Sequence, residues 1–161
     1  MRLLVKNAIF TLLVPGVVAI GLPLTLARGR PLAANPLLLA LGAGLLGVGV
    51  ATYVRCVWDF AAFGRGTPLP LDAPRRLVRR GLYRYTRNPM YLGVLCVAGA
   101  WSAIFASSWL LLYAAGMALA FQVFVVLYEE PRLRALFGTE YDAYLRMVPR
   151  WLPRPRPRTP E

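Results

Sequence analysis

The chain has 161 residues, of which 58% are hydrophobic, and a formal net charge of +12. This combination is unusual for a soluble domain, whose charges cover its whole surface, and the length suggests a single domain, residues 1–161. The sequence has no histidine and two widely separated cysteines, Cys56 and Cys96, which argues against histidine triads and metal sites.

Charged residues are absent from three long stretches, residues 7–27, 31–54 and 88–128. The first two contain 21 and 24 residues, each enough for a helix to cross ~30 Å of hydrocarbon at ~1.5 Å per residue. The third contains 41 residues, enough for two crossings joined by a turn. We therefore expect an all-α integral membrane protein with four transmembrane helices, followed by a short cytosolic amphipathic C-terminal helical segment.

The first two helices are expected within residues 1–60. Helix one should run over residues 7–26 and bend at Pro15 and Pro23, which lipid-embedded helices tolerate when neighbouring helices satisfy the freed carbonyls. Its apolar part is too long for a signal peptide, so we expect it to remain. Helix two should start near Asn35 and Pro36. It carries small residues at four-residue spacing, which predicts close helix packing through Ala40, Gly44, Ala43, Gly47 and Ala51.

Arg55 and Asp59 lie four residues apart near the end of helix two and so share one face. An ion pair at the membrane interface is the interpretation we favour. A place in the wall of a functional site stays open, because ionisable groups at membrane depth are often functional.

The second part of the chain, residues 61–153, starts with an irregular loop over residues 61–86, rich in glycine and proline. Helix three is predicted over residues 89–105, a turn over residues 106–109, and helix four over residues 109–128. Gln122 is the one strongly polar side chain in helix four, and suits a helix–helix hydrogen bond or a ligand contact. Residues 131–153 have the pattern of two short amphipathic helices interrupted by Gly138. Residues 154–161 are predicted to be an extended, mobile tail.

The distribution of lysine and arginine predicts the topology. If both termini lie on one side, sixteen basic residues outside the transmembrane helices fall on that side. They are two before residue 7, seven in residues 65–87 and seven in residues 132–158, whereas only Arg28 and Arg30 fall on the other side. The positive-inside rule then predicts cytoplasmic termini and a multi-pass protein, most compatible with a bacterial-type inner membrane. Anionic lipid head groups explain the net charge, so we expect membrane lipids and no nucleic acid among the partners.

Two polar clusters are predicted to meet at this cytoplasmic face. The first is the stretch PRRLVRRGLYRYTRNPMYLG, residues 74–93, in which a basic and aromatic loop runs into helix three at Asn88 and Pro89. The second is Glu129 and Glu130, where helix four should end. Because helices three and four form a hairpin, both clusters lie at the same end of it.

These two blocks carry a resemblance. RRGLYRYTRNPMYLG, followed after one helical hairpin by EEPRLRALFGTEYDAYLRMVPRWLP, resembles the isoprenylcysteine carboxyl methyltransferase family, whose wider group includes phospholipid methyltransferases. The likeness covers residues 64–153, and the first two helices match only as membrane helices. It implies an integral membrane enzyme that transfers a methyl group from S-adenosylmethionine to a lipophilic acceptor.

The resemblance also implies the cofactor site, placed between the membrane helices and the cytosolic C-terminal segment. The residues implied to bind the cofactor are Leu77, Val78, Tyr83, Arg87, Asn88, Pro89, Met90, Tyr91, Glu129 and Glu130. Their chemistry agrees, because arginine suits the methionine carboxylate, carboxylates suit the ribose diol or the amine, and aromatic faces suit adenine or a sulfonium. No catalytic side chain can be named from the sequence.

The chain departs from the family pattern in two places. Asn88 stands where the family often has histidine before the proline, and Val125 stands where prenylcysteine enzymes have a substrate-binding arginine. The second departure weakens the case for a prenylcysteine carboxylate as the acceptor. We expect a lipophilic, membrane-embedded acceptor with a carboxylate or another polar group, and its identity stays open. Two alternatives also stay open, a non-enzymatic membrane scaffold and a sterol-type membrane reductase with a nicotinamide cofactor.

Overall fold

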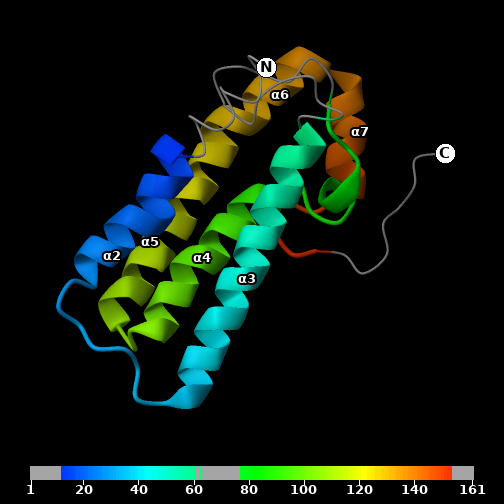
Figure 1. Cartoon of the computed structure of the whole chain (residues 1–161). Helices are drawn as coiled ribbons and strands as arrows, with labels where there is room; N and C mark the ends of the chain where they lie inside the picture. Colours follow the sequence, from blue (N-terminus) through cyan, green and yellow to red (C-terminus); the bar gives the residue numbers. More distant parts are fainter. Residues whose placement is uncertain (1–11, 61, 63–76, 154–161) are drawn as a thin grey trace.

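In the computed structural model, which describes residues 12–60, 62 and 77–153, every regular element is a helix (Figure 1). The long helices lie alongside one another as a bundle, and the last two helices sit at one end of it. The elements in chain order are η1 (Leu12–Gly21), α2 (Leu22–Leu26), α3 (Pro36–Asp59), η3 (Gly81–Arg84), α4 (Pro89–Ile104), α5 (Ser108–Phe124), η4 (Val125–Glu129), α6 (Glu130–Phe137) and α7 (Thr139–Met147).

Helix starts follow the capping signals in the sequence. The Asn35 side chain accepts a hydrogen bond from the backbone of Leu37 (2.9 Å), and Pro36 occupies the first turn of α3. Ser107 likewise accepts from the backbone of Leu110 (3.4 Å) at the start of α5. Such side chains satisfy backbone N–H groups that have no partner within the helix. The predicted start of helix two and the predicted turn before helix four are therefore confirmed.

Two backbone carbonyls about one turn before Pro23 accept hydrogen bonds from neighbouring helices. Pro23 has no N–H to donate, so one carbonyl about one turn earlier lacks its usual partner within the helix. The carbonyl of Ala19 accepts from the Trp101 indole (2.8 Å), and that of Val18 accepts from the Tyr113 hydroxyl (2.6 Å). The wide helix η1 is thus tied to α4 and α5, as tolerance of proline in an apolar helix requires.

The close contact between α3 and α4 is made by glycines other than those predicted. A Cβ added to Gly49 would lie 2.7 Å from the carbonyl oxygen of Gly93, and one added to Gly42 would lie 3.0 Å from that of Ala100. Gly44 and Gly47 have nothing within 4 Å of such a Cβ. The predicted stripe of small residues was wrong, because the seven-residue spacing of Gly42 and Gly49, rather than the four-residue spacing, selects the packed face.

Helix four is longer than predicted. α5, η4 and α6 form one apolar helix over Ser108–Phe137, so the helix continues through Glu129 and Glu130 instead of ending at Tyr128. Pro131 lies two residues after the end of the π-helical turn η4. The wider turn changes the hydrogen-bond pattern at the point where proline cannot donate, so the helix passes the proline without ending.

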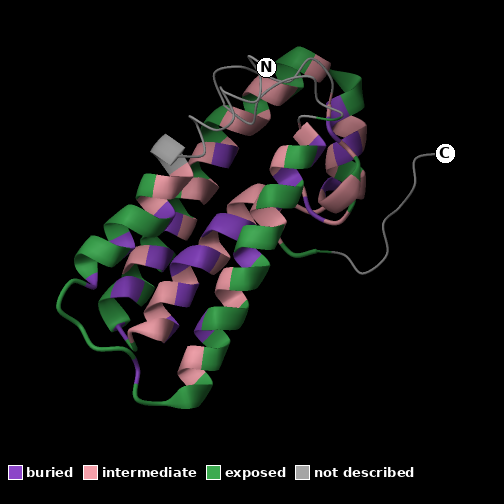
Figure 2. Ribbon diagram, viewed as in Figure 1, coloured by how far each residue is buried: buried purple, intermediate pink, exposed green. Residues whose placement is uncertain are grey.

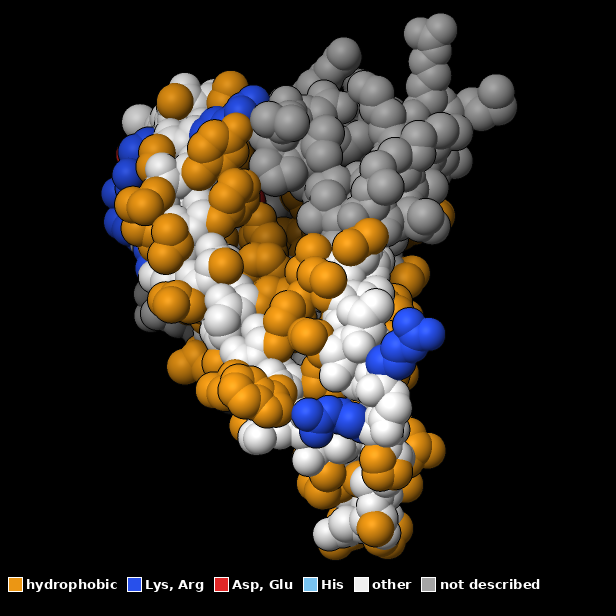
Figure 3. Space-filling view, turned by 90° about the vertical axis from the view of Figure 1, so that its left-hand side faces the viewer, with side chains coloured by type: hydrophobic (Ala, Val, Ile, Leu, Met, Phe, Trp, Pro, Cys, Tyr) orange, Lys and Arg blue, Asp and Glu red, His pale blue; other side chains and the backbone are white. Residues whose placement is uncertain are grey.

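Among the described residues, two helices are long and apolar enough to cross a membrane, Pro36–Asp59 and Ser108–Phe137. Only 11% and 17% of the most apolar parts of these two helices is buried. Most of their apolar surface therefore faces outward rather than into a core (Figure 2). Figure 3 shows one such face, where hydrophobic side chains predominate along the bundle. The other two predicted crossings correspond to shorter helices, Pro15–Leu26 and Pro89–Ile104, so four crossings are not established. The start predicted for helix one and the tail after residue 153 lie outside the described residues.

The C-terminal part forms the predicted pair of short helices, α6 and α7. Gly138 separates them with a positive φ of 52°, a conformation that favours glycine. Tyr141, Tyr144 and Val148 are buried, and Leu77 packs against them. The α7 side of this helix pair therefore lies against the residues that precede η3.

Candidate active site

Glu130 forms the centre of an ionic cluster at the end of the bundle. It accepts hydrogen bonds from Arg87 Nη1 (2.9 Å) and from Arg150 Nε and Nη2 (2.7 and 3.0 Å). The Arg87 and Glu130 side chains are 11% and 12% exposed, whereas that of Arg150 is 32% exposed. The hydrogen bond to Glu130 raises the pKa of Arg150. Two guanidiniums around one carboxylate leave a net positive charge in a place with little water.

Glu129 lies next to this cluster but has a different partner. Its Oε2 accepts a hydrogen bond from the Tyr91 hydroxyl (2.7 Å). The Tyr91 ring is also 4.7 Å from that of Phe121, measured between centroids. The two neighbouring glutamates thus form two distinct polar groups, one paired with arginines and one with a phenol.

The segment after α7, residues 148–151, folds back onto the start of α4, and we call it the strap. The backbone N–H of Arg87 donates to the Pro149 carbonyl (2.9 Å). Thr86 Oγ1 and Asn88 Nδ2 both donate to the Arg150 carbonyl (3.0 and 3.1 Å). These bonds satisfy the buried Thr86 and Asn88 side chains and hold Arg150 beside Glu130.

The residues before α4 form the third side of the site. Val78 and Tyr83 are buried together with Cys56, and the Tyr144 hydroxyl donates to the Tyr83 carbonyl (2.7 Å). Burial raises the pKa of both phenols well above its ordinary value, so they stay neutral at physiological pH. Neutral phenols here can donate hydrogen bonds but do not act as bases.

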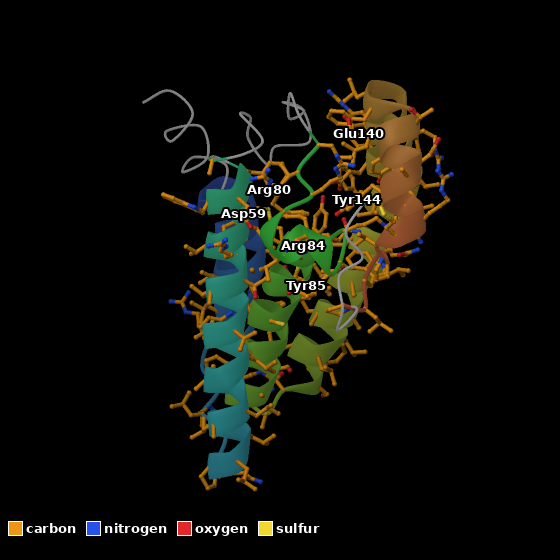
Figure 4. The ribbon with its side chains drawn as sticks, turned by 90° about the vertical axis from the view of Figure 1, so that its right-hand side faces the viewer. Asp59, Arg80, Arg84, Tyr85, Glu140 and Tyr144 are labelled. Atoms are coloured by element: carbon orange, nitrogen blue, oxygen red, sulfur yellow. The ribbon has the colours of Figure 1, made fainter. Side chains whose placement is uncertain are left out.

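Asp59 lies on the opposite side of this segment, at the end of α3 (Figure 4). Its side chain is wholly buried, Arg55 Nη2 lies 3.4 Å from Oδ1, and neither carboxylate oxygen has a hydrogen-bond partner among the described residues. Its carboxylate occupies the space that a Cβ at residue 81 would need, so the contact requires glycine there. The positive φ of Gly81, +57°, also favours glycine. The predicted ion pair is confirmed, and it supports the segment that carries Tyr83.

The structure brings most of the predicted site residues to one end of the bundle, in several groups. Arg87 with Glu130 and Tyr91 with Glu129 are in direct contact, while Asn88 and the buried Pro89 lie under the strap. The hydrophobic members separate, because Leu77 packs against α7, whereas Val78 and Met90 pack around Tyr83.

Arg150 and Trp151 are the residues that sequence reasoning missed. Both belong to the stretch PRWLP, which carried the resemblance but received no role. The Trp151 indole donates to Gln122 Oε1 (2.6 Å), so Gln122 makes a hydrogen bond to the strap rather than to a neighbouring membrane helix. Within residues 12–60, 62 and 77–153, no group of three His, Cys, Asp or Glu side chains could hold a metal ion.

The described residues thus define an all-helical membrane protein with a charged and aromatic site at one end of its bundle. The family model for phospholipid methyltransferase matches residues 37–140, about two thirds of the chain, and the chain belongs to this family of methyltransferases. The matched residues include α3, α4, α5 and both glutamates but not the strap. No curated protein and no solved structure matches the chain.

Proposed function

We propose that the chain is an integral membrane methyltransferase that uses S-adenosylmethionine and methylates a lipophilic acceptor. The observation that carries the proposal is the meeting of the Arg87–Glu130–Arg150 cluster with the Tyr91–Glu129 pair at one end of an apolar bundle. A scaffold has no need of two glutamates and two arginines gathered at one end of the bundle, because largely buried ionic groups are costly.

The residues present fit the polar groups of this cofactor. Arg87 Nε is buried and has no hydrogen-bond partner among the described residues, so it retains a donor for an anion. With Arg150 it would hold the methionine carboxylate, since guanidiniums bind carboxylates through charge-assisted hydrogen bonds. Glu129 has acceptor capacity beyond its bond to Tyr91, and would hold the ammonium group or the ribose hydroxyls. The backbone of Leu77 and Val78, beside the buried Tyr83, would line the adenine.

Methyl transfer requires alignment more than proton transfer. When bound, the cofactor would supply an electrophilic methyl group for transfer to the acceptor. The protein's part is to hold the two reactants in line, which can lower a barrier by roughly 7–11 kcal/mol. The buried Tyr83 and Tyr144 and the apolar helices around the site would limit the access of water to it.

The proposed topology places this site at the cytoplasmic membrane surface. Arg28 and Arg30 follow α2 at the other end of the bundle from the site, and they are the basic residues predicted to lie outside. With α2 and α4 tied to the longer helices, all four would cross a bacterial-type inner membrane. The acceptor would then reach the site from the bilayer.

Binding to the purified protein in detergent tests the proposal. S-Adenosylhomocysteine, the product form of the cofactor, should bind in calorimetric titration, whereas NADPH should not. Methylthioadenosine lacks the amino-acid portion, so Arg150→Gln should weaken S-adenosylhomocysteine and leave methylthioadenosine unchanged. Binding of NADPH alone would favour the reductase, and binding of neither molecule would favour the scaffold.

A further inference from the structure

Trp151 occupies an unusual position for a residue of an extended segment. Its indole donates to Gln122, which lies seven residues before Glu129 on the same continuous helix and hence ~10 Å deeper along the bundle. The strap therefore passes through the ionic cluster at Arg150 and reaches, one residue later, into the apolar layer. The next residue, Leu152, is 83% exposed, so the chain leaves the bundle directly afterwards.

Three aromatic rings connect the polar site to that apolar layer, and we call them the aromatic wall: Tyr91, Phe121 and Trp151. The Tyr91 ring lies 4.7 Å from the Phe121 ring and 6.4 Å from the Trp151 ring, the latter in an edge-on arrangement. The hydroxyl of the same Tyr91 donates to Glu129. Tyr91 is thus the element shared by the candidate site and the wall.

The wall is fixed in place rather than loosely packed. The indole N–H has its partner in Gln122, and in an apolar surrounding that bond is costly to break because no water can replace it. The backbone before Trp151 is fastened by the bonds from Thr86, Arg87 and Asn88 to Pro149 and Arg150. A rigid aromatic surface beside a reaction site can discriminate between shapes, which a mobile one cannot.

From this arrangement we infer that Trp151 is a specificity-determining residue, and that the apolar group next to the acceptor's nucleophile lies against the aromatic wall. The inference rests on the proposed function. An acceptor whose polar end meets the cofactor beside the Tyr91–Glu129 pair, and whose chain extends into the bilayer along the aromatic wall, passes the Trp151 ring. A bulky indole there favours a single slender chain over a branched or double one.

The first test asks whether acyl chains reach Trp151, and it does not depend on activity. Full-length protein is placed in nanodiscs of a phosphatidylcholine whose acyl chain is dibrominated near its carboxyl end, and in discs of the unbrominated lipid. The difference in emission between wild type and Trp151→Phe isolates the signal of Trp151. Bromine should quench more than half of it. Equal emission in the two kinds of disc would overturn the inference.

The second test measures selection. Rates of methyl transfer to a single-chain and to a two-chain phosphatidylethanolamine give a preference ratio, which Trp151→Ala should shift about tenfold toward the two-chain lipid, the equivalent of ~1.4 kcal/mol. Trp151→Phe should shift it less, because the ring remains. Affinity for S-adenosylhomocysteine should stay unchanged in both variants. An unaltered ratio in an active Trp151→Ala variant would refute the inference.

Controls separate the inference from the proposed function. Trp109, 69% exposed at the start of α5, provides the matched substitution Trp109→Ala, which should leave the preference ratio unchanged. If wild-type protein binds S-adenosylhomocysteine but methylates neither lipid, phosphatidylethanolamine is not the acceptor, and the quenching result decides the inference. If wild type does not bind S-adenosylhomocysteine, the proposed function fails irrespective of the quenching result.

Discussion

Replacing Glu130 by glutamine should destabilise the protein strongly. The carboxylate receives three hydrogen bonds from two guanidiniums, and the side chains of Arg87 and Glu130 are 11% and 12% exposed. Removing one partner from a buried ion pair costs roughly 3–5 kcal/mol, because the remaining charge is left without compensation. The exposure of Arg150 (32%) reduces its share, so we expect about 3 kcal/mol.

Thermal unfolding in detergent can be followed in a Cys96→Ser background through Cys56, which is wholly buried and reacts with a maleimide dye only when the bundle opens. The matched control is Glu140→Gln. Glu140 pairs with Arg79 at 3.1 Å, but these side chains are 46% and 36% exposed, and such pairs contribute roughly 0–1 kcal/mol. If both substitutions lower the unfolding midpoint equally, the Glu130 cluster is not the buried ionic centre that we describe.

Three further predictions concern packing, pH and topology. Gly49→Val should prevent α3 from packing on α4 and abolish folding, whereas Gly47→Val, in open space, should have little effect on the same dye assay. Burial raises the pKa of Tyr141 to about 12, so between the ordinary value near 10 and 12 the unfolded state releases a proton that the folded state keeps. Stability should therefore fall as pH rises through this range, with a smaller slope in Tyr141→Phe. For topology, cysteines introduced at the exposed Arg30 and Arg146 should be labelled from opposite sides of the membrane; labelling from one side would refute the proposed arrangement.

The positions of the helices could be predicted because charge, proline and capping residues mark them locally. The starts of α3 and α4 follow from Asn35–Pro36 and Asn88–Pro89, and the break at Gly138 follows from glycine alone. The end of α5 could not be predicted. Glutamates and a proline usually end an apolar helix, but here the π-helical turn η4 accommodates Pro131 and the helix continues.

Part of the candidate site could likewise be predicted from the sequence, and part could not. The meeting of Arg87 with Glu130 follows from the helical hairpin, because the ends of two antiparallel helices must lie together. The strap does not follow, since the return of Arg150 and Trp151 to α4 and α5 depends on hydrogen bonds across more than sixty residues to Thr86 and Asn88. No local pattern encodes such contacts. The packed face of α3 was mistaken for the same reason, because the sequence alone does not show which glycines meet α4.

Transfer of radiolabelled methyl from S-adenosylmethionine into lipid-extractable material tests the central claim most directly. Wild-type protein in native membrane lipids should incorporate the label. Glu129→Gln keeps the shape of the side chain but loses its charge. A hydrogen bond to a charged group contributes ~1.5–3 kcal/mol, so this substitution should weaken cofactor binding roughly 10- to 150-fold. The variant should stay folded in the dye assay. Two results would contradict the account. The first is that folded wild-type protein binds S-adenosylhomocysteine but incorporates no label with lipids of any head-group class. The second is that Glu129→Gln keeps both its cofactor affinity and full incorporation.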